Sequence, residues 1–450
     1  MSKNKRIGIM GSGLVGSMWA VYLAKRGYAV DIFERRQDMR KADISAGRSI
    51  NLALSNRGFN ALNGIGCDEI IKDISIAMYG REIHDKQGNT KFQSYGLDQE
   101  AIYSVSRGAI NRRMMDEAQK HSNVNLYFNT KCDAIDLYKG HVSLKDTETG
   151  KSLNNEYDIV FGADGAFSKV REAMVKTSGF NYSQSYLEHG YKELVIPPAK
   201  DGGWRIKKNA LHIWPRRSFM IIALPNLDGS FTVTLFLAHK GPVSFEALNT
   251  DEKVMTFFQK EFPDALEVMP TLIKDWHENP EAPLVTVRTS PWHRGRSVIM
   301  GDAAHAIVPF YGQGMNSGFE DCFEMNKILD QTQDNWDQAL ELFSQQRVAN
   351  GHAIADLAIQ NFIEMRDSVA DEEFLRRKKI SKHLVEIYKG KYRPQYDLVT
   401  FTQVPYKDAL AFGAVQNKIL DEITAISNVD ARLAEGEKIF EVEGILEKYL

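Results

Sequence analysis

The N-terminal part of the chain alternates between apolar runs and a glycine-rich break. Residues 6–10 read RIGIM and residues 29–33 read AVDIF, and both runs are expected to be buried strands. Residues 17–26 have a helical pattern that ends at Gly27. The order strand, glycine-rich turn, helix, strand is typical of an α/β protein with a parallel sheet.

Further apolar runs predict two other kinds of sheet structure. Residues 157–161 and 297–300 are continuously apolar, as in strands that are covered on both faces. The β-rich runs 210–214, 218–224 and 231–237 predict an antiparallel sheet. A hairpin is expected over 83–95, with its turn at 86–89, and the chain after Gln338 is expected to be mostly helical.

These elements predict an α/β fold in which an antiparallel β-sheet domain is inserted into a Rossmann-like domain and a helical region follows. The Rossmann-like domain is expected to be discontinuous and to comprise residues 1–60, 106–176 and 290–370. The remaining ranges are 61–105 and 177–289 for the β-sheet domain and 371–450 for the C-terminal helical region.

Composition narrows the class of protein. The 450 residues are 43% hydrophobic and 26% charged, as in an ordinary soluble enzyme, and the formal net charge of −3 argues against a nucleic acid partner. The 3 cysteines form no CxxC pair, so we predict neither a disulfide framework nor a metal site. No apolar stretch reaches the length of a membrane span, so a soluble, cytoplasmic protein is expected.

The glycine-rich turn predicts a dinucleotide site. Gly11 permits the tight turn, Gly13 lets the backbone approach a pyrophosphate, and Gly16 lets the helix lie close to the sheet. Glu34, at the end of the second strand, is placed to accept hydrogen bonds from a ribose 2′-OH. A carboxylate there would repel a 2′-phosphate, so the unit favours FAD or NAD.

Two later strands also end in small residues and an acid. Asp164 and Gly165 follow the run at 157–161, and Gly301 and Asp302 follow the run at 297–300. Taken alone, Asp164 is equally well interpreted as a local helix cap. The second is followed by a glycine-rich turn, residues 312–314, that opens a helix. We expect these strand ends to converge on one edge of the sheet. Because there is a single dinucleotide unit, any nicotinamide cofactor must bind transiently and without a domain of its own.

Longer runs carry a family resemblance. The chain resembles the single-component flavin-dependent aromatic hydroxylases, the p-hydroxybenzoate hydroxylase class, and within it those that act on L-kynurenine. The resemblance extends to about Tyr406. It is carried by FERR at 33–36, GRSINLALS at 47–55, HGYKEL at 189–194, NALHIWPR at 209–216, ALPNLDGSFTVTLF at 223–236 and GDAAHAIVPFYGQGMN at 301–316.

The resemblance implies a bound FAD, with NADPH as a transient co-substrate. It implies hydroxylation of L-kynurenine to 3-hydroxy-L-kynurenine by O₂ through a flavin C4a-hydroperoxide. The implied cofactor residues are Gly11, Gly13, Leu14, Val15, Gly16, Glu34, Arg35, Arg36, Ala53, Arg107, Asp302, Gly314, Met315 and Asn316.

The resemblance also implies a substrate site. Arg81, Tyr95, Asn361 and Tyr396 would bind the amino-acid end of the substrate. An apolar pocket for its ring would comprise Leu211, Met220, Ile222, Leu224, Phe236, Pro309, Phe310 and Met365. Near the reacting atoms, the candidate residues are Gln313 and Tyr311, the latter standing where the family pattern has a histidine.

Alternatives remain at this point. Taken alone, Arg81 would be a solvated arginine, and His305 is more readily interpreted as a hydrogen-bonded structural histidine at the edge of the fold than as a base. The substrate could be another aromatic acid, and a non-catalytic flavin-binding regulatory protein is a second possibility. The expected oligomeric state is a monomer or a homodimer.

Overall fold

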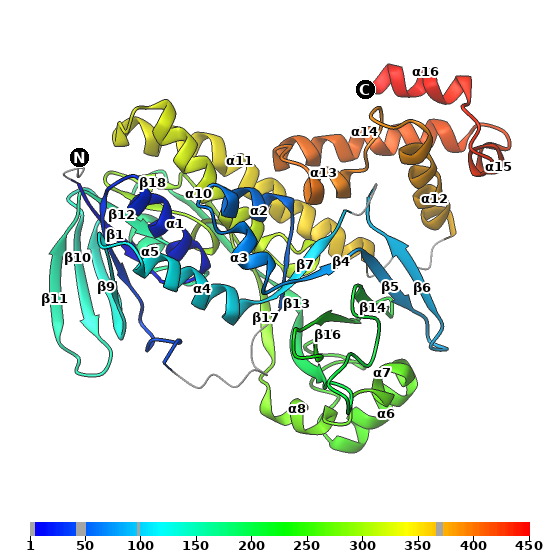
Figure 1. Ribbon diagram of the computed structural model, residues 1–450, viewed down its shortest axis with the longest axis horizontal. Coiled ribbons are helices and arrows are strands. Elements are labelled where there is room, and N and C mark those ends of the chain that lie inside the picture. Colours follow the sequence, from blue (N-terminus) through cyan, green and yellow to red (C-terminus); the bar gives the residue numbers. More distant parts are fainter. Residues whose placement is uncertain (1–4, 42–50, 97–99, 366–371) are drawn as a thin grey trace.

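The computed structural model describes residues 5–41, 51–96, 100–365 and 372–450 (Figure 1). Residues 47–50, the start of the run GRSINLALS, lie outside the described residues. The first sheet has six strands, and all its neighbouring pairs are parallel except the pair at β18. Its order is β18 (His293–Arg294), β19 (Ser297–Ile299), β12 (Ile159–Gly162), β1 (Arg6–Met10), β2 (Ala29–Phe33) and β8 (Val124–Tyr127).

The predicted βαβ unit is present, and its helix starts earlier than expected. Helix α1 spans Leu14–Lys25, because Gly13 already has the extended backbone of an N-cap residue and its carbonyl accepts from the N–H of Ser17 at 3.0 Å. The sheet core also includes residues of further helices. These are α2 (Asn56–Asn63), α3 (Asp68–Lys72), α4 (Arg107–Gln119), α5 (Lys169–Val175) and α10 (Gly314–Gln331).

The second sheet has seven strands and contains both the expected hairpin and the expected antiparallel strands. Its order is β17 (Ala282–Ser290), β13 (Asn181–Ile196), β16 (Phe231–Ala238), β15 (Met220–Pro225), β14 (Leu211–Pro215), β5 (Gly80–His84) and β6 (Thr90–Ser94). Strand β5 pairs with β14 in parallel, with Arg81 opposite Leu211. The hairpin therefore forms one edge of this sheet.

One face of the second sheet packs against three short helices, and the other packs against η1, which directly precedes the glycine-rich turn at 312–314, and against α11. Helices α6, α7 and α8 cover the first face, below the sheet in Figure 1. On the other face, Met220 and Phe236 belong to one hydrophobic core with residues of η1 and α11. The bounds are α6 (Asp251–Glu261), α7 (Pro263–Glu267), α8 (Leu272–Glu278), α9 (Asp302–His305), η1 (Pro309–Tyr311) and α11 (Trp336–Ile363).

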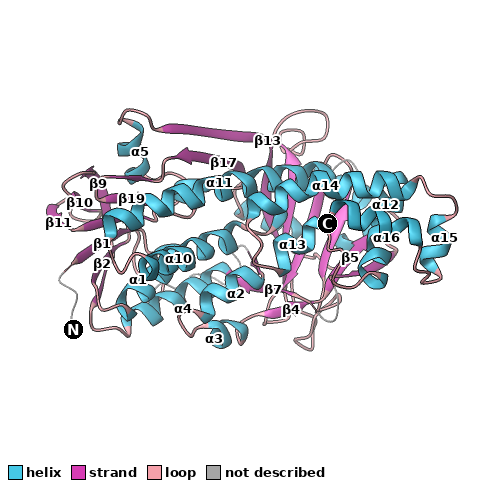
Figure 2. Ribbon diagram, turned by 90° about the horizontal axis from the view of Figure 1, so that it is seen from above, coloured by secondary structure: helices cyan, strands magenta, loops and turns pink. Residues whose placement is uncertain are grey.

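The C-terminal part of the chain is helical, as expected. Helix α11 continues alongside α14, and α12 and α14 to α16 share a core of their own (Figure 2). The helices are α12 (Glu372–Ile387), α13 (Gln395–Phe401), α14 (Tyr406–Thr424), α15 (Val429–Ala434) and α16 (Phe440–Tyr449). None of the helices in the described ranges is both long and apolar enough for a membrane span.

Two small antiparallel sheets had no clear sequence signal. They are β9 (Thr130–Asp136), β10 (His141–Asp146) and β11 (Ser152–Glu156), and β3 (Asn51–Leu54), β7 (Ile102–Ser106) and β4 (Ile76–Met78). Ile65 and Ile71 lie in the range assigned to the β-sheet domain, but they pack in the core of the first sheet. The domain division stays a prediction.

A buried histidine chain joins the second sheet to α7. His212 Nε2 lies 2.8 Å from the backbone oxygen of Lys207, which can only accept, so the Nδ1 of His212 accepts from His84 Nε2 at 2.9 Å. His84 Nδ1 lies 2.7 Å from the carboxylate of Asp264. Burial lowers the pKa of His212 to about 4, so this ring is neutral in the folded protein.

We expect His212 to make the protein less stable in acid. Below a pH of about 6.5 the unfolded chain takes a proton that the folded chain refuses until about pH 4, so stability falls by about 1.4 kcal/mol per pH unit in that window. The variant His212→Gln keeps a donor and an acceptor but cannot titrate. Its unfolding temperature should fall less than that of the wild type between pH 7.5 and pH 5.

The quantity to compare is the change in unfolding temperature with pH in the wild type and in His212→Gln. Asp397, whose pKa is raised to about 6 mainly by burial, acts with the opposite sign, since the folded chain holds its proton up to that pH. Both proteins contain Asp397, so its contribution cancels. Parallel pH profiles for the wild type and His212→Gln would contradict the assignment.

Candidate functional site

Four neighbouring strands of the first sheet end at one edge. Strands β19, β12, β1 and β2 are adjacent and parallel, and they are followed by Asp302, Asp164, Gly11 and Glu34. The convergence predicted from the strand ends is confirmed. Parallel sheets bind ligands at this carboxyl edge.

The three glycines of the first turn differ in what surrounds them. Gly11 has a φ of +100°, and a Cβ there would lie 2.4 Å from the carbonyl oxygen of Ala163. A Cβ on Gly16 would lie 2.0 Å from the carbonyl oxygen of Gly11. A Cβ on Gly13 would meet nothing within 4 Å. Gly11 and Gly16 are therefore required by the fold itself, whereas Gly13 faces open space where Leu14 begins α1.

The carboxylate of Glu34 is held beside this turn. It is buried and accepts from the backbone N–H of Ser12 at 3.2 Å and from the backbone N–H and the Nε of Arg36, both at 3.1 Å. The side chains of Arg35 and Arg36 are exposed. Glu34 thus lies with its charge at the rim of the turn, as the dinucleotide prediction requires.

Val15 connects the first turn to the third strand end. A Cβ on Gly301 or on Gly318 would lie 2.8 Å from Cγ2 of Val15, and Gly301 has a φ of +59°. These two glycines are explained by the protein's own packing. No ligand is needed to account for them. Asp302, the first residue of α9, is exposed at the sheet edge.

Asn316 fixes the glycine-rich turn that opens α10. Its Nδ2 donates to the carbonyl oxygens of Ala53 and Gly312, both at 2.8 Å, and its Oδ1 accepts from the N–H of Ser55 at 2.9 Å. Asn316 is fully buried and Met315 nearly so. The turn, with the free N–H groups of Gly314 and its neighbours, is therefore held rigidly against the end of β3.

The two candidate residues near the reacting atoms have protein partners. The buried amide of Gln313 accepts from the hydroxyl of Tyr406 at 3.0 Å and lies 3.5 Å from Ser55 Oγ. The ring of Tyr311 stacks on Tyr396 with centroids 5.4 Å apart. Burial raises the pKa of Tyr311 far above its usual value. Tyr311 therefore keeps its proton at neutral pH.

Arg81, Tyr95 and Tyr396 come together although they are far apart in the chain. The guanidinium of Arg81 lies 4.5 Å from the ring centroid of Tyr396 and 5.6 Å from that of Tyr95. The two rings stack with centroids 6.1 Å apart. Among the described residues, neither Arg81 Nε nor the hydroxyl of Tyr95 has a hydrogen-bond partner, and both atoms are buried. Such a site fits an anionic, hydrogen-bonding ligand group.

The predicted apolar pocket residues lie in two adjoining clusters around this site. Met220, Phe236, Phe310 and Tyr311 belong to one, against which Met365 packs. Tyr95 and Leu224 belong to the other, with Ala53 and Leu211 packed against it; Ile222 and Tyr396 contact both clusters. Pro309 is exposed at the start of η1.

Asn361 lies next to this pocket. Its Nδ2 donates to the carbonyl oxygen of Phe310 at 2.6 Å and lies 3.4 Å from the sulfur of Met365. Asn361 thus joins α11 to η1, which carries Tyr311. Its amide nitrogen is occupied by the protein, and its predicted contact with the amino-acid end of the substrate stays a prediction.

Sequence reasoning missed several charged groups near the site. Glu364 pairs with Lys378 at 2.7 Å, and the pKa of Lys378 is lowered by burial and by the charge of Arg81. Burial also raises the pKa of Glu193, which the charge of Arg107 partly offsets. Glu193 belongs to the run HGYKEL that carried the resemblance, whereas Lys378 had no signal in the sequence.

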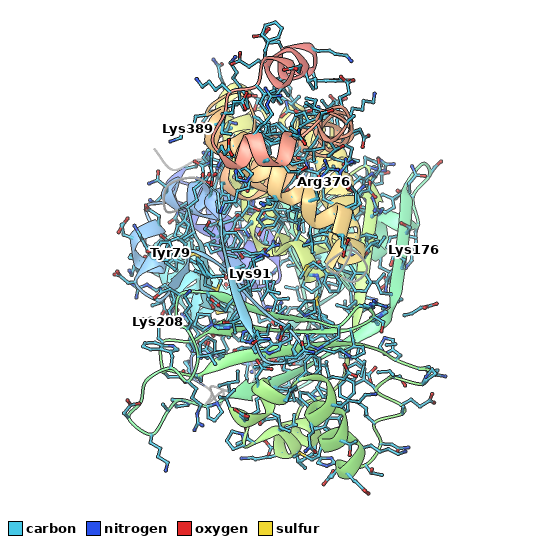
Figure 3. The ribbon with its side chains drawn as sticks, turned by 90° about the vertical axis from the view of Figure 1, so that its right-hand side faces the viewer. Tyr79, Lys91, Lys176, Lys208, Arg376 and Lys389 are labelled. Carbon is cyan, nitrogen blue, oxygen red and sulfur yellow. The ribbon has the colours of Figure 1, made fainter. Side chains whose placement is uncertain are left out.

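Seen from the side in Figure 3, the hairpin with Lys91 lies below the C-terminal helices.

His305 is a structural residue in this fold. Its Nε2 lies 2.6 Å from Asp321 Oδ2, and its ring stacks on Trp292 with centroids 4.8 Å apart. The preferred interpretation, a hydrogen-bonded histidine, is confirmed. The residue is buried rather than at the edge of the fold.

Comparisons with known proteins agree with this architecture. Residues 5–358 match the family of the FAD binding domain. The chain is similar in structure to 2-methyl-3-hydroxypyridine-5-carboxylic acid oxygenase, with a TM-score of 0.66 and 20% identity over 83% of this chain and 96% of that one. It is also similar to P. aeruginosa PqsL in complex with 2-aminobenzoylacetate, with a TM-score of 0.62 and 18% identity over 80% and 99%. The fold is that of the FAD-dependent monooxygenases.

Relatives in sequence define the group more narrowly. The kynurenine 3-monooxygenase of Flavobacterium johnsoniae is 46% identical over 433 residues, 96% of each chain. That of Christiangramia forsetii is 41% identical over 449 residues, and that of Dictyostelium discoideum is 43% identical over 462 residues, 99% of this chain and 98% of its own. The chain belongs to the kynurenine 3-monooxygenase family, and the resemblance in the sequence is confirmed.

Proposed function

We propose that this protein hydroxylates L-kynurenine to 3-hydroxy-L-kynurenine with FAD, NADPH and O₂. The observation that carries the proposal is the buried Arg81 Nε, which has no hydrogen-bond partner among the described residues and lies beside the stacked rings of Tyr95 and Tyr396. A substrate with a carboxylate at one end and an aromatic ring at the other matches a cation beside an apolar pocket.

The residues at the sheet edge fit FAD. Gly13 leaves open space at the N-terminus of α1, where N–H groups can meet a pyrophosphate, and Glu34 lies within reach as a ribose acceptor. Asp302 would contact the ribityl chain, Arg107 the flavin side chain, and the N–H groups of residues 314–316 the flavin ring. When bound, FAD supplies the redox chemistry and the activation of O₂.

The protein's own part in the reaction is to bind, orient and exclude water. Arg81 would pair with the substrate carboxylate, and the hydroxyl of Tyr95, which lies near Arg81 and Tyr396, would add a hydrogen bond. The clusters that contain Phe236 and Phe310 would keep water from the reacting atoms. The position of the flavin ring would depend on the rigid glycine-rich turn that Asn316 holds.

We propose no obligatory protein base. Tyr311 holds its proton at neutral pH because it is buried, and the amide of Gln313 does not titrate. The amino group on the substrate ring already activates the neighbouring carbon. Gln313 and Tyr311 would therefore shape the site and hold hydrogen bonds.

The experiment that tests this function is identification of the product. Purified protein with FAD, NADPH, O₂ and L-kynurenine should yield a product 16 mass units heavier, with the hydroxyl ortho to the amine. NADPH oxidation should rise when L-kynurenine is added. Hydroxylation of p-hydroxybenzoate alone would indicate another aromatic acid as the substrate, and no substrate-stimulated NADPH oxidation would indicate a regulatory flavoprotein.

Two further features belong to the proposal. The Rossmann-like and β-sheet domains and the C-terminal helical region would keep the limits given by the sequence. The protein would be a monomer or a homodimer, which light scattering on the purified, FAD-loaded protein distinguishes.

A further inference from the structure

Arg57, in the first turn of α2, is a fully buried cation that is not part of the proposed binding site. Its Nε donates to the carbonyl oxygen of Val399 at 2.9 Å, and its Nη2 donates to those of Leu398, at 3.4 Å, and Val404. Its Nη1 donates to Glu320 at 2.5 Å. One side chain thus connects three separate segments of the chain.

The three carbonyl groups belong to the end of a short helix and the residues after it. Helix α13 spans only Gln395–Phe401, so the carbonyls of Leu398 and Val399 are among the four at its C-terminus that lack a partner within the helix. A cation at a helix C-terminus also interacts favourably with the helix dipole. Arg57 therefore stabilises α13, the helix that carries Tyr396.

The other contacts of Arg57 lead to the glycine-rich turn. Its guanidinium lies 4.1 Å from the ring centroid of Tyr406, whose hydroxyl donates to Gln313 at 3.0 Å. Glu320 lies on α10, which begins directly after Gln313, and its second oxygen pairs with Arg347 at 2.8 Å. Arg57 is thus connected to this turn in two ways, through the ring of Tyr406 and through Glu320 on α10.

We propose that Arg57 is a positioning residue that couples the segment 395–406 to the flavin turn. The inference rests on the proposed function, because Tyr396 would bind substrate and Gln313 would lie beside the flavin. Without Arg57, the carbonyl of Val399 loses its partner and only the hydroxyl of Thr402 remains on that of Leu398. Tyr396 then loses its fixed place beside Arg81, 4.5 Å from its guanidinium. Substrate affinity and the exclusion of water from the flavin then weaken together.

The variant Arg57→Lys separates positioning from simple loss of folding. Lysine keeps the positive charge beside Glu320, whose second oxygen still pairs with Arg347. An ammonium group cannot reproduce the planar fork that reaches several carbonyls at once. The charge of the core is preserved while the anchoring of α13 is lost.

A matched control is Arg26→Lys. Arg26 is also nearly buried and contacts α10 at its opposite end, through Asn326 and Asp330, and Asp334 just beyond it. Within the described part of the chain, its hydrogen bonds and ion pairs go to residues 326–334 and not to the segment 395–406. The control therefore weakens the attachment of the same helix away from the site.

The experiment measures three quantities on the FAD-loaded proteins. In Arg57→Lys, the KM for L-kynurenine should rise about tenfold and the fraction of NADPH oxidation that ends in H₂O₂ should increase. Hydrogen exchange of the backbone amides in 395–406 should become about tenfold faster, with flavin content unchanged. Arg26→Lys should match the wild type in all three.

A folded, flavin-loaded Arg57→Lys with wild-type KM, H₂O₂ fraction and exchange would overturn the proposal. If Arg57→Lys does not fold, Tyr406→Phe takes its place, because it removes only the bond to Gln313. It should raise the H₂O₂ fraction and the exchange rate of 395–406, and wild-type values would also overturn the proposal. A wild type that does not hydroxylate L-kynurenine defeats the proposed function instead, while the exchange measurement still tests the coupling.

Discussion

Replacing Arg81 by alanine is expected to raise the KM for L-kynurenine about 10- to 100-fold while kcat changes far less. The guanidinium would hold the carboxylate end of the substrate, which is remote from the reacting carbon in L-kynurenine, so its bonds to the carboxylate would be equally strong in the ground state and the transition state. A charge-assisted hydrogen bond contributes about 1.5–3 kcal/mol, which sets the size of the effect. Steady-state kinetics of product formation, with L-kynurenine as the varied substrate, measure it.

Two companion variants make the Arg81 experiment specific. Arg81→Lys keeps the charge but loses the bidentate geometry, so it should recover part of the lost affinity. Lys91→Ala removes an exposed cation from the partner strand of the same hairpin and should leave KM unchanged. A wild-type KM in Arg81→Ala would show that the carboxylate is bound elsewhere.

The sequence predicted those parts of the fold that local patterns determine. Strands β1 and β2, the helix between them and Glu34 follow one another within a short stretch, so apolar periodicity and turn residues suffice. The same holds for β14 to β16, whose runs are apolar and separated by a clear turn. The edge where the predicted cofactor residues meet then follows from the rules for parallel sheets.

Other parts depend on contacts between distant segments, and no local pattern predicts these. The first half of β13 is a polar run that pairs only with β17, about a hundred residues later, so its strand character comes from the partner. The proximity of Arg81 to Tyr396 could be inferred only from the family resemblance. The anchoring of α13 by Arg57 could not be inferred at all, because backbone carbonyls carry no sequence signal.

The glycines show how a sequence motif and its structure complement each other. The motif assigns Gly11 to the tight turn, Gly16 to helix packing and Gly13 to the approach of a pyrophosphate. The structure agrees with this division, because a Cβ at Gly11 or Gly16 would collide with backbone oxygen atoms and a Cβ at Gly13 would not. Only Gly13 can therefore be replaced to test the ligand rather than the fold.

Gly13→Val is expected to yield a folded protein that does not retain FAD. Gly13 has a φ of −75° and a ψ of −172°, which any residue can adopt, and the space beyond its Cα is open. The added side chain would instead occupy the space through which a pyrophosphate reaches the N-terminus of α1. The purified variant should lack the flavin absorption band near 450 nm, and added FAD should not raise its unfolding temperature, since a ligand stabilises only a state that binds it.

The glycines on either side supply the control for this experiment. In Gly16→Ala the added methyl group would lie 2.0 Å from the carbonyl oxygen of Gly11, so this variant should lose stability whether or not FAD is present. Gly13→Ala, with a single methyl group in open space, should fold like the wild type and bind FAD more weakly. A yellow Gly13→Val protein with one FAD per chain would mean that the pyrophosphate does not pass over this turn, and the assignment of the cofactor site would fail with it.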